Sequence, residues 1–151
     1  MNVRPKQMGV FEARSRESFE ERLTEHVRTR YAGQKVGTSA GVFRVSELKE
    51  ECLRAMVRYS IEKAKRHGIT WESSTAAFAA LMFTVGPRFD EHPDIRGKLD
   101  DPEVPDNSRV DHLCYVIPKA KWRDVKQAQG AQAWSSALPT LKFSRQEDKR
   151  A

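Results

Sequence analysis

The chain has 151 residues, of which 32% are charged and 38% hydrophobic, and its formal net charge is +6. This length is typical of one domain that buries about two-thirds of the surface exposed by its unfolded chain. A mean hydropathy of −0.70 excludes an integral membrane protein, and the longest apolar run, residues 76–85, falls short of the roughly 20 residues that cross a bilayer.

The charge is distributed in three blocks. Residues 1–67 carry 15 Lys and Arg against 9 Asp and Glu, residues 68–117 carry 4 against 9, and residues 118–151 carry 8 against 3. Because the basic and acidic blocks can attract one another on folding, the high overall pI is a weak argument for nucleic-acid binding.

The N-terminal segment predicts a long amphipathic helix that begins at Pro5, a residue well suited to the first helical position, and ends near Tyr31. Its apolar stripe consists of Met8, Phe11, Phe19, Leu23 and Val27. The segment has no apolar core of a secretory signal, so we expect a cytoplasmic protein.

Residues 32–45 contain three glycines, Gly33, Gly37 and Gly41, and we expect a long loop here, with residues 42–45 as the one strand-like fragment. A phosphate-binding loop would need four residues between two glycines and then Lys and Ser or Thr. That motif is absent from this segment.

Two helical patterns follow. Residues 46–67 predict an amphipathic helix, since an apolar stripe runs along the segment, acidic residues stand at its start and basic residues at its end. Gly68 then supplies a left-handed ending. Residues 70–85 include the run AAFAALMFTV, which is apolar nearly all round and therefore predicts a buried helix that ends at Gly86-Pro87.

The acidic segment from Phe89 predicts a short helix over residues 93–99 and a second helix that begins at Asp106 or Asn107. A further helix carries Trp122 and Val125. We therefore predict an all-α fold over residues 1–129, a small bundle of four to six helices around the buried helix.

Residues 130–151 form a C-terminal tail whose large apolar side chains follow no clear period. They dock either on the chain's own core or in the groove of a partner, since exposed apolar groups mark contacts. The candidate partner-binding residues are Trp134, Leu138, Leu141 and Phe143.

The sequence contains no recognisable catalytic or metal-binding constellation. The acidic side chains Asp90, Glu91, Asp94, Asp100, Asp101 and Glu103, with His92, lack the spacing of a calcium loop or a zinc site, and Asp90 and Asp94 suit helix capping equally well. His112 and Cys114 point in different directions on a helix. We expect Cys52 and Cys114 to be buried thiols. We also expect no metal, no cofactor and no catalytic residue, although a site assembled in space would not be visible in the sequence.

A basic nucleic-acid interface is the alternative. Arg54, Arg58, Lys65 and Arg66 in the second helix, and Lys142, Arg145, Lys149 and Arg150 in the tail, could contact phosphates. Acidic residues interrupt both groups, and no helix has the polar face of a recognition helix.

Residues 5–117 resemble a group of small helical bacterial proteins of unassigned activity, often encoded near type VI secretion components and their effectors. The resemblance rests on the segments HGIT and MFTVGPRFD and on the acidic, proline-containing segment that follows. It implies a chaperone, adaptor or immunity-like partner of a secretion-system effector. Together with the missing catalytic constellation, it favours a non-catalytic cytoplasmic module that binds another protein.

Overall fold

The structure, a computed structural model, describes the backbone of residues 5–146 and the side chains of residues 17–146. It is mostly helical, with one two-stranded antiparallel sheet. The helices are α1 (Pro5–Arg30), α2 (Glu50–Arg66), α3 (Glu72–Thr84), α4 (Pro93–Leu99), α5 (Arg109–Val116), α6 (Lys119–Ala128) and α7 (Ala133–Ala137). The strands are β1 (Lys35–Thr38) and β2 (Gly41–Arg44), and three 3₁₀ turns are η1 (Val45–Glu47), η2 (Phe89–Glu91) and η3 (Asp106–Ser108).

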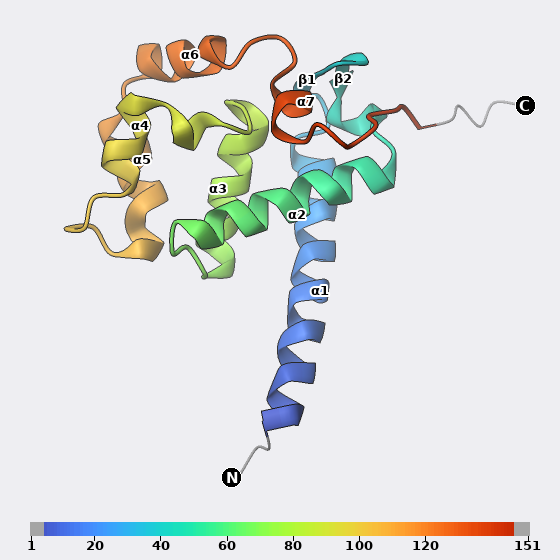
Figure 1. The fold of residues 1–151 in the computed structure, drawn as a ribbon, viewed down its shortest axis with the longest axis vertical. Coiled ribbons are helices and arrows are strands. Elements are labelled where there is room, and N and C mark those ends of the chain that lie inside the picture. Colours follow the sequence, from blue (N-terminus) through green and yellow to red (C-terminus); the bar gives the residue numbers. More distant parts are fainter. Residues whose placement is uncertain (1–4, 147–151) are drawn as a thin grey trace, which may run out of the picture.

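The first half of α1 extends beyond the rest of the described chain, and its second half crosses α2 (Figure 1). In that second half Leu23 and Val27 are buried and Phe19 is partly buried, as the apolar stripe predicts. The side chains of Met8 and Phe11 lie outside the described residues. In Figure 1, α4, α5 and α6 lie on one side of α3, and the hairpin and α7 lie on the other.

The helix α3 packs against α1, α2 and α5. Phe78, Ala79, Met82 and Phe83 are buried, whereas the alanines on its other side are only partly buried. The glycines that end α2 and α3 adopt positive φ angles, +78° at Gly68 and +137° at Gly86, as the stop signals predict.

The expected loop over residues 32–45 is wrong, because this segment forms the β1–β2 hairpin, in which Val36 pairs with Phe43. Both side chains are buried. The strand-like fragment at residues 42–45 overlaps β2, whereas four residues that include Gly37 carry too little alternation to indicate β1. The hairpin is supported by α7, which packs against β1, and the Ser39 amide donates to Ser135 Oγ at 2.7 Å.

The helix α2 begins at Glu50, later than the predicted residue 46. The preceding residues are held by the tail instead, since Leu48 forms a β-bridge with Arg145 and the Lys49 amide donates to the Ser144 carbonyl. No helix in residues 5–146 is both long and apolar enough to cross a membrane.

Candidate functional site

The acidic segment meets the C-terminal half of α2 in a network of charged side chains. Asp90 in η2 is buried, and it lies against Lys63 of α2 and against His67, the residue that follows α2. Asp100, just after α4, contacts the other side of His67. The segmented charge of the sequence is therefore used inside the chain, where the basic end of α2 and the acidic segment attract each other.

His67 is held by carboxylates on both ring nitrogens. Nε2 lies 2.8 Å from Asp90 Oδ2, and Nδ1 lies 2.8 Å from Asp100 Oδ1. The hydrogen bond with Asp90, and secondarily that with Asp100, raises the pKa of His67 in spite of its partial burial. Because neither nitrogen is free to accept a proton from a substrate, His67 is not placed as a general base.

Lys63 is buried beneath the same network. Its Nζ lies 2.7 Å from Asp90 Oδ1 and 3.0 Å from Glu91 Oε2, and it donates to the Pro87 carbonyl at 2.8 Å. Burial alone would lower the pKa of Lys63, but the hydrogen bond and charge of Asp90, together with the hydrogen bond of Glu91, outweigh it and raise this pKa. Arg88, followed by Lys63, lowers the pKa of Glu91 to about 2.

The sequence pattern assigned Lys63 and His67 to helix-dipole stabilisation and suggested Asp90 as a helix cap. Lys63 does lie in the basic last turn of α2, but the cap of α4 is His92 and not Asp90, since His92 Nδ1 accepts from the Asp94 amide. The opposite charges of the two blocks were the one signal in the sequence for this contact. Among residues 17–146, no group of three or more His, Cys, Asp or Glu has the arrangement of a metal site.

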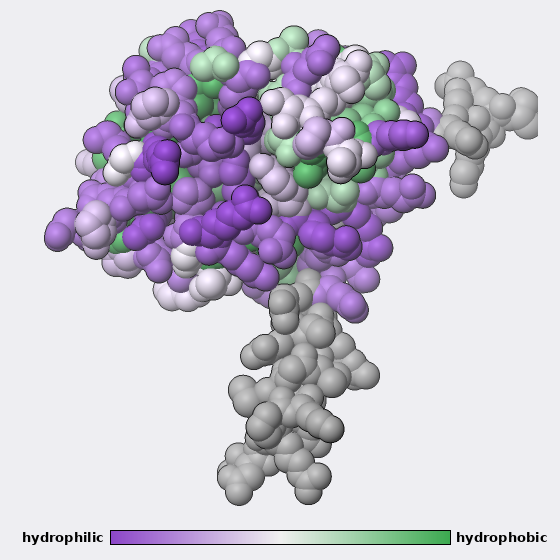
Figure 2. Space-filling view, viewed as in Figure 1, coloured by the Kyte–Doolittle hydropathy of each residue, from purple (hydrophilic) through white to green (hydrophobic). Residues whose placement is uncertain are grey.

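A cavity of about 770 Å³ opens over this network between α2, η2 and α4, and we call it the charged cavity. Tyr59, Arg66 and Arg96 line it together with the network. Strongly hydrophilic side chains cover this part of the surface in Figure 2. All eight lining residues except Tyr59 carry an acidic or basic side chain, so the chemistry of the cavity suits electrostatic binding.

The two cysteines differ in exposure. Cys52 is buried as expected, and its Sγ lies 3.3 Å from the Lys142 carbonyl. Cys114 is exposed, so the expectation of two buried thiols is wrong for this residue. It lies on the solvent side of α5, whereas Val110 and Leu113 of the same helix are buried. Partial desolvation and the charge of Asp111 raise the pKa of the Cys114 thiol, which disfavours the reactive thiolate.

The tail docks on the chain's own core. Trp134 is 2% exposed and packs against Phe83, with ring centroids 5.1 Å apart. Phe143 is buried, and Leu138 and Leu141 are partly buried against the core. This placement does not test whether these four residues also bind a partner, and that role stays a prediction.

A second cavity, of about 230 Å³, lies between the hairpin, the C-terminal end of α3 and α7, and we call it the hairpin cavity. Its lining is largely apolar and includes Val36, Phe83 and Trp134. Val42, also in the lining, is 55% exposed, one of the few large apolar side chains on the described surface. Its charged lining residues, Lys35 and Lys126, are both basic.

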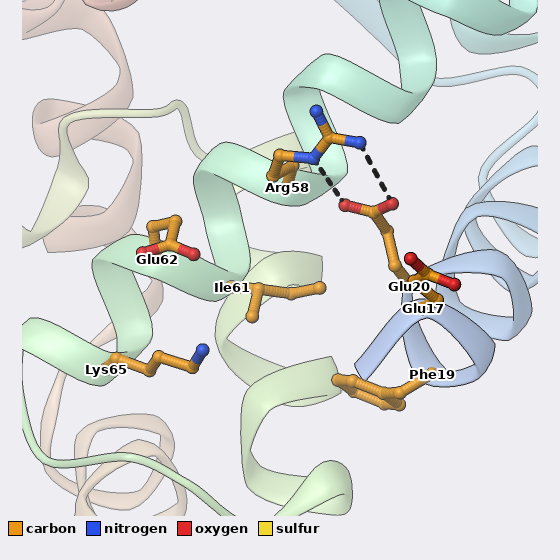
Figure 3. Close-up of a pocket in the computed structure, with 7 residues that line it drawn as sticks. All are labelled: Glu17, Phe19, Glu20, Arg58, Ile61, Glu62 and Lys65. Atoms are coloured by element: carbon orange, nitrogen blue, oxygen red, sulfur yellow. Dashed lines mark hydrogen bonds and ion pairs between the residues drawn. The ribbon is translucent and has the colours of Figure 1, made fainter. Parts of the chain in front are cut away.

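A third recess, of about 270 Å³, lies between α1 and α2 (Figure 3). Phe19 and Ile61 face its opening, and Arg58 spans the two helices by donating to both carboxylate oxygens of Glu20 at 2.7 and 3.2 Å. Charges of both signs surround it. This recess is therefore a bridged helix junction without a preference for one ligand charge.

The basic residues proposed for nucleic acid are partly neutralised within the chain. Arg54 pairs with Glu21 at 3.3 Å, Arg58 with Glu20, and Arg145 with Glu47 at 3.5 Å. Lys149 and Arg150 lie outside the described residues. An ion-paired arginine is less available to a phosphate, which disfavours the nucleic-acid interface.

Comparison of this chain with protein-family models, with curated proteins and with solved structures yields no match.

Proposed function

We propose that this chain is a non-catalytic, cytoplasmic protein-binding module and that its partner docks at the hairpin cavity. The observation that carries the proposal is the combination of an apolar lining, the exposed Val42 and a rim whose charges are all positive. A contiguous apolar surface rimmed by charged residues is typical of sites that bind a protein partner.

The chemistry of the cavity defines the partner segment. An apolar side chain would enter beside Trp134 and Val42, and acidic side chains on either side of it would face Lys35 and Lys126. Among residues 17–146, neither lysine has an ion-pair partner within 4.0 Å. Electrostatic complementarity of this kind selects partners and accelerates association.

The tail contributes to the same proposal. Trp134 forms a wall of the cavity, while Leu138 and Leu141 are partly buried further along the segment. The surface over α7 and the residues that follow it is paler or greener in Figure 2 than its surroundings, and therefore less hydrophilic. Phe143, the last of the four candidate residues, is buried in the core.

The resemblance to proteins encoded near type VI secretion components suggests which partner to test. On that basis we propose an effector or another secretion component, bound by this chain as a chaperone, adaptor or immunity-like protein. We also propose that the helices form a bundle around α3 and that this bundle is the scaffold of the binding module.

The test is affinity capture from the native host, followed by measurement of the dissociation constant with the purified partner. Val42→Asp and Lys126→Glu place negative charge opposite an acidic segment. We expect each to weaken binding about tenfold or more, because the first variant loses an apolar contact and the second loses a charge pair. Deletion of residues 130–151 is unsuitable, since it also removes Trp134 from the core.

Lys119→Glu is the matched control, because Lys119 is an exposed lysine on α6 that does not line the hairpin cavity. We expect it to retain binding within about twofold, since rim charges remote from a contact contribute little. Equal loss in all three variants, or no captured partner for the unmodified chain, would refute the proposed function.

A further inference from the structure

The charged cavity is lined by Lys63, Arg66 and Arg96 and by three carboxylates, with His67 held between two of those carboxylates. Within it, each carboxylate already faces a cation: Asp90 faces Lys63 and His67, Glu91 faces Lys63 and Arg88, and Asp100 faces His67. The floor of the cavity is therefore internally compensated.

Arg66 and Arg96 are different. Both line the cavity and are exposed, one in the last turn of α2 and the other on α4. Among residues 17–146, no carboxylate oxygen lies within 4.0 Å of either guanidinium. Two arginines from different helices thus lie at one opening. Each guanidinium has five N–H donors, and none of them is paired with a carboxylate.

We propose that the charged cavity is a binding site for a small molecule that carries a phosphate group, held by Arg66 and Arg96. A guanidinium forms paired, charge-assisted hydrogen bonds with planar or tetrahedral oxyanions. A phosphate monoester carries a charge of about −1.5 to −2 at pH 7, which matches two unpaired arginines better than a single carboxylate does.

The size of the cavity defines the rest of the ligand. A volume of about 770 Å³ exceeds that needed for a phosphate alone and falls in the range of about 300–1,000 Å³ that is usual for small-molecule sites. Tyr59 supplies an aromatic ring to the lining, and Lys63 Nζ lies 5.6 Å from its centroid. The body of the ligand would lie against this ring, with its phosphate at the arginines. This site is separate from the hairpin cavity and does not depend on the proposed partner.

The test is isothermal titration calorimetry, in which pyrophosphate or inorganic phosphate is added to the purified chain. The salt concentration is about 50 mM, where surface charges are only partly screened. We expect saturable binding to one site. Arg66→Gln and Arg96→Gln should each weaken it about tenfold or more, because each removes one set of charge-assisted hydrogen bonds. Both side chains are exposed, so the variants should keep the melting temperature of the unmodified chain.

Lys98→Gln is the matched control, since Lys98 is an exposed cation of α4 that does not line the cavity. Its loss should change the affinity less than about twofold, as expected of an exposed charge. Citrate and a short single-stranded oligonucleotide are titrated in parallel. Absence of saturable phosphate binding, binding of citrate or the oligonucleotide alone, or equal weakening by Lys98→Gln would each overturn the proposal.

Discussion

Replacement of Asp90 by Asn should destabilise the fold more than any exposed charge substitution. Asn keeps the size of the side chain but removes the charge that Lys63 and His67 share. The side chains of Asp90 and Lys63 are 3% and 6% exposed, so water cannot replace the lost partner. The free energy of unfolding therefore falls because the buried ammonium of Lys63 keeps fewer opposite charges around it.

Removal of one partner from a buried ion pair costs about 3–5 kcal/mol. Lys63 keeps Glu91 at 3.0 Å and the Pro87 carbonyl at 2.8 Å, which places the expected loss near the lower end, about 3 kcal/mol. For a chain of this length such a loss lowers the melting temperature by roughly 6–12 °C.

The assay is urea unfolding followed by tryptophan fluorescence, which reports the loss of the buried Trp134 environment. The midpoint should fall with little change in the slope, since the surface exposed on unfolding is unchanged. Asp111→Asn is the control, because Asp111 is exposed and has no cation within 4.0 Å among residues 17–146; it should change stability by less than about 0.5 kcal/mol. A loss below about 1 kcal/mol for Asp90→Asn would refute this reasoning about the network, since it is what an ordinary neutral hydrogen bond contributes.

Three further predictions concern other residues. The pKa of His67 is raised above its ordinary value of 6.5, so its contribution to stability is complete below about pH 6.5 and is lost as the pH rises through the higher pKa of the folded state; His67→Gln should remove this dependence in urea unfolding curves measured across that range. A β-carbon at Gly37 would overlap a backbone carbonyl of the segment before α7, whereas one at Gly33 would meet nothing within 4 Å; Gly37→Ala should therefore cost about 1–3 kcal/mol in thermal unfolding, and an equal effect of Gly33→Ala would contradict the packing of the hairpin on α7. A thiol reagent should label Cys114 in the folded protein and Cys52 only after denaturant is added, because Cys114 alone is exposed; simultaneous labelling of both would contradict the burial of Cys52.

The sequence was sufficient where the signals are local. The start of α1 and the ends of α2 and α3 follow from Pro5, Gly68 and Gly86, because proline and glycine restrict or permit particular backbone angles whatever surrounds them. The buried face of α2 follows from the spacing of its apolar residues. This signal is also local, because residues three and four apart share one side of a helix.

The tertiary structure alone decided the pairing of β1 with β2, the position of the tail, and the charged and hairpin cavities. The strand β1 packs against α7, which follows about 100 positions later in the chain. The clamp on His67 joins side chains that are 23 and 33 positions apart. Residue order reports which charges are present, but the distances that turn Asp90, Lys63 and His67 into one buried network, and leave Arg66 and Arg96 unpaired at its mouth, arise only when α2, η2 and α4 pack together.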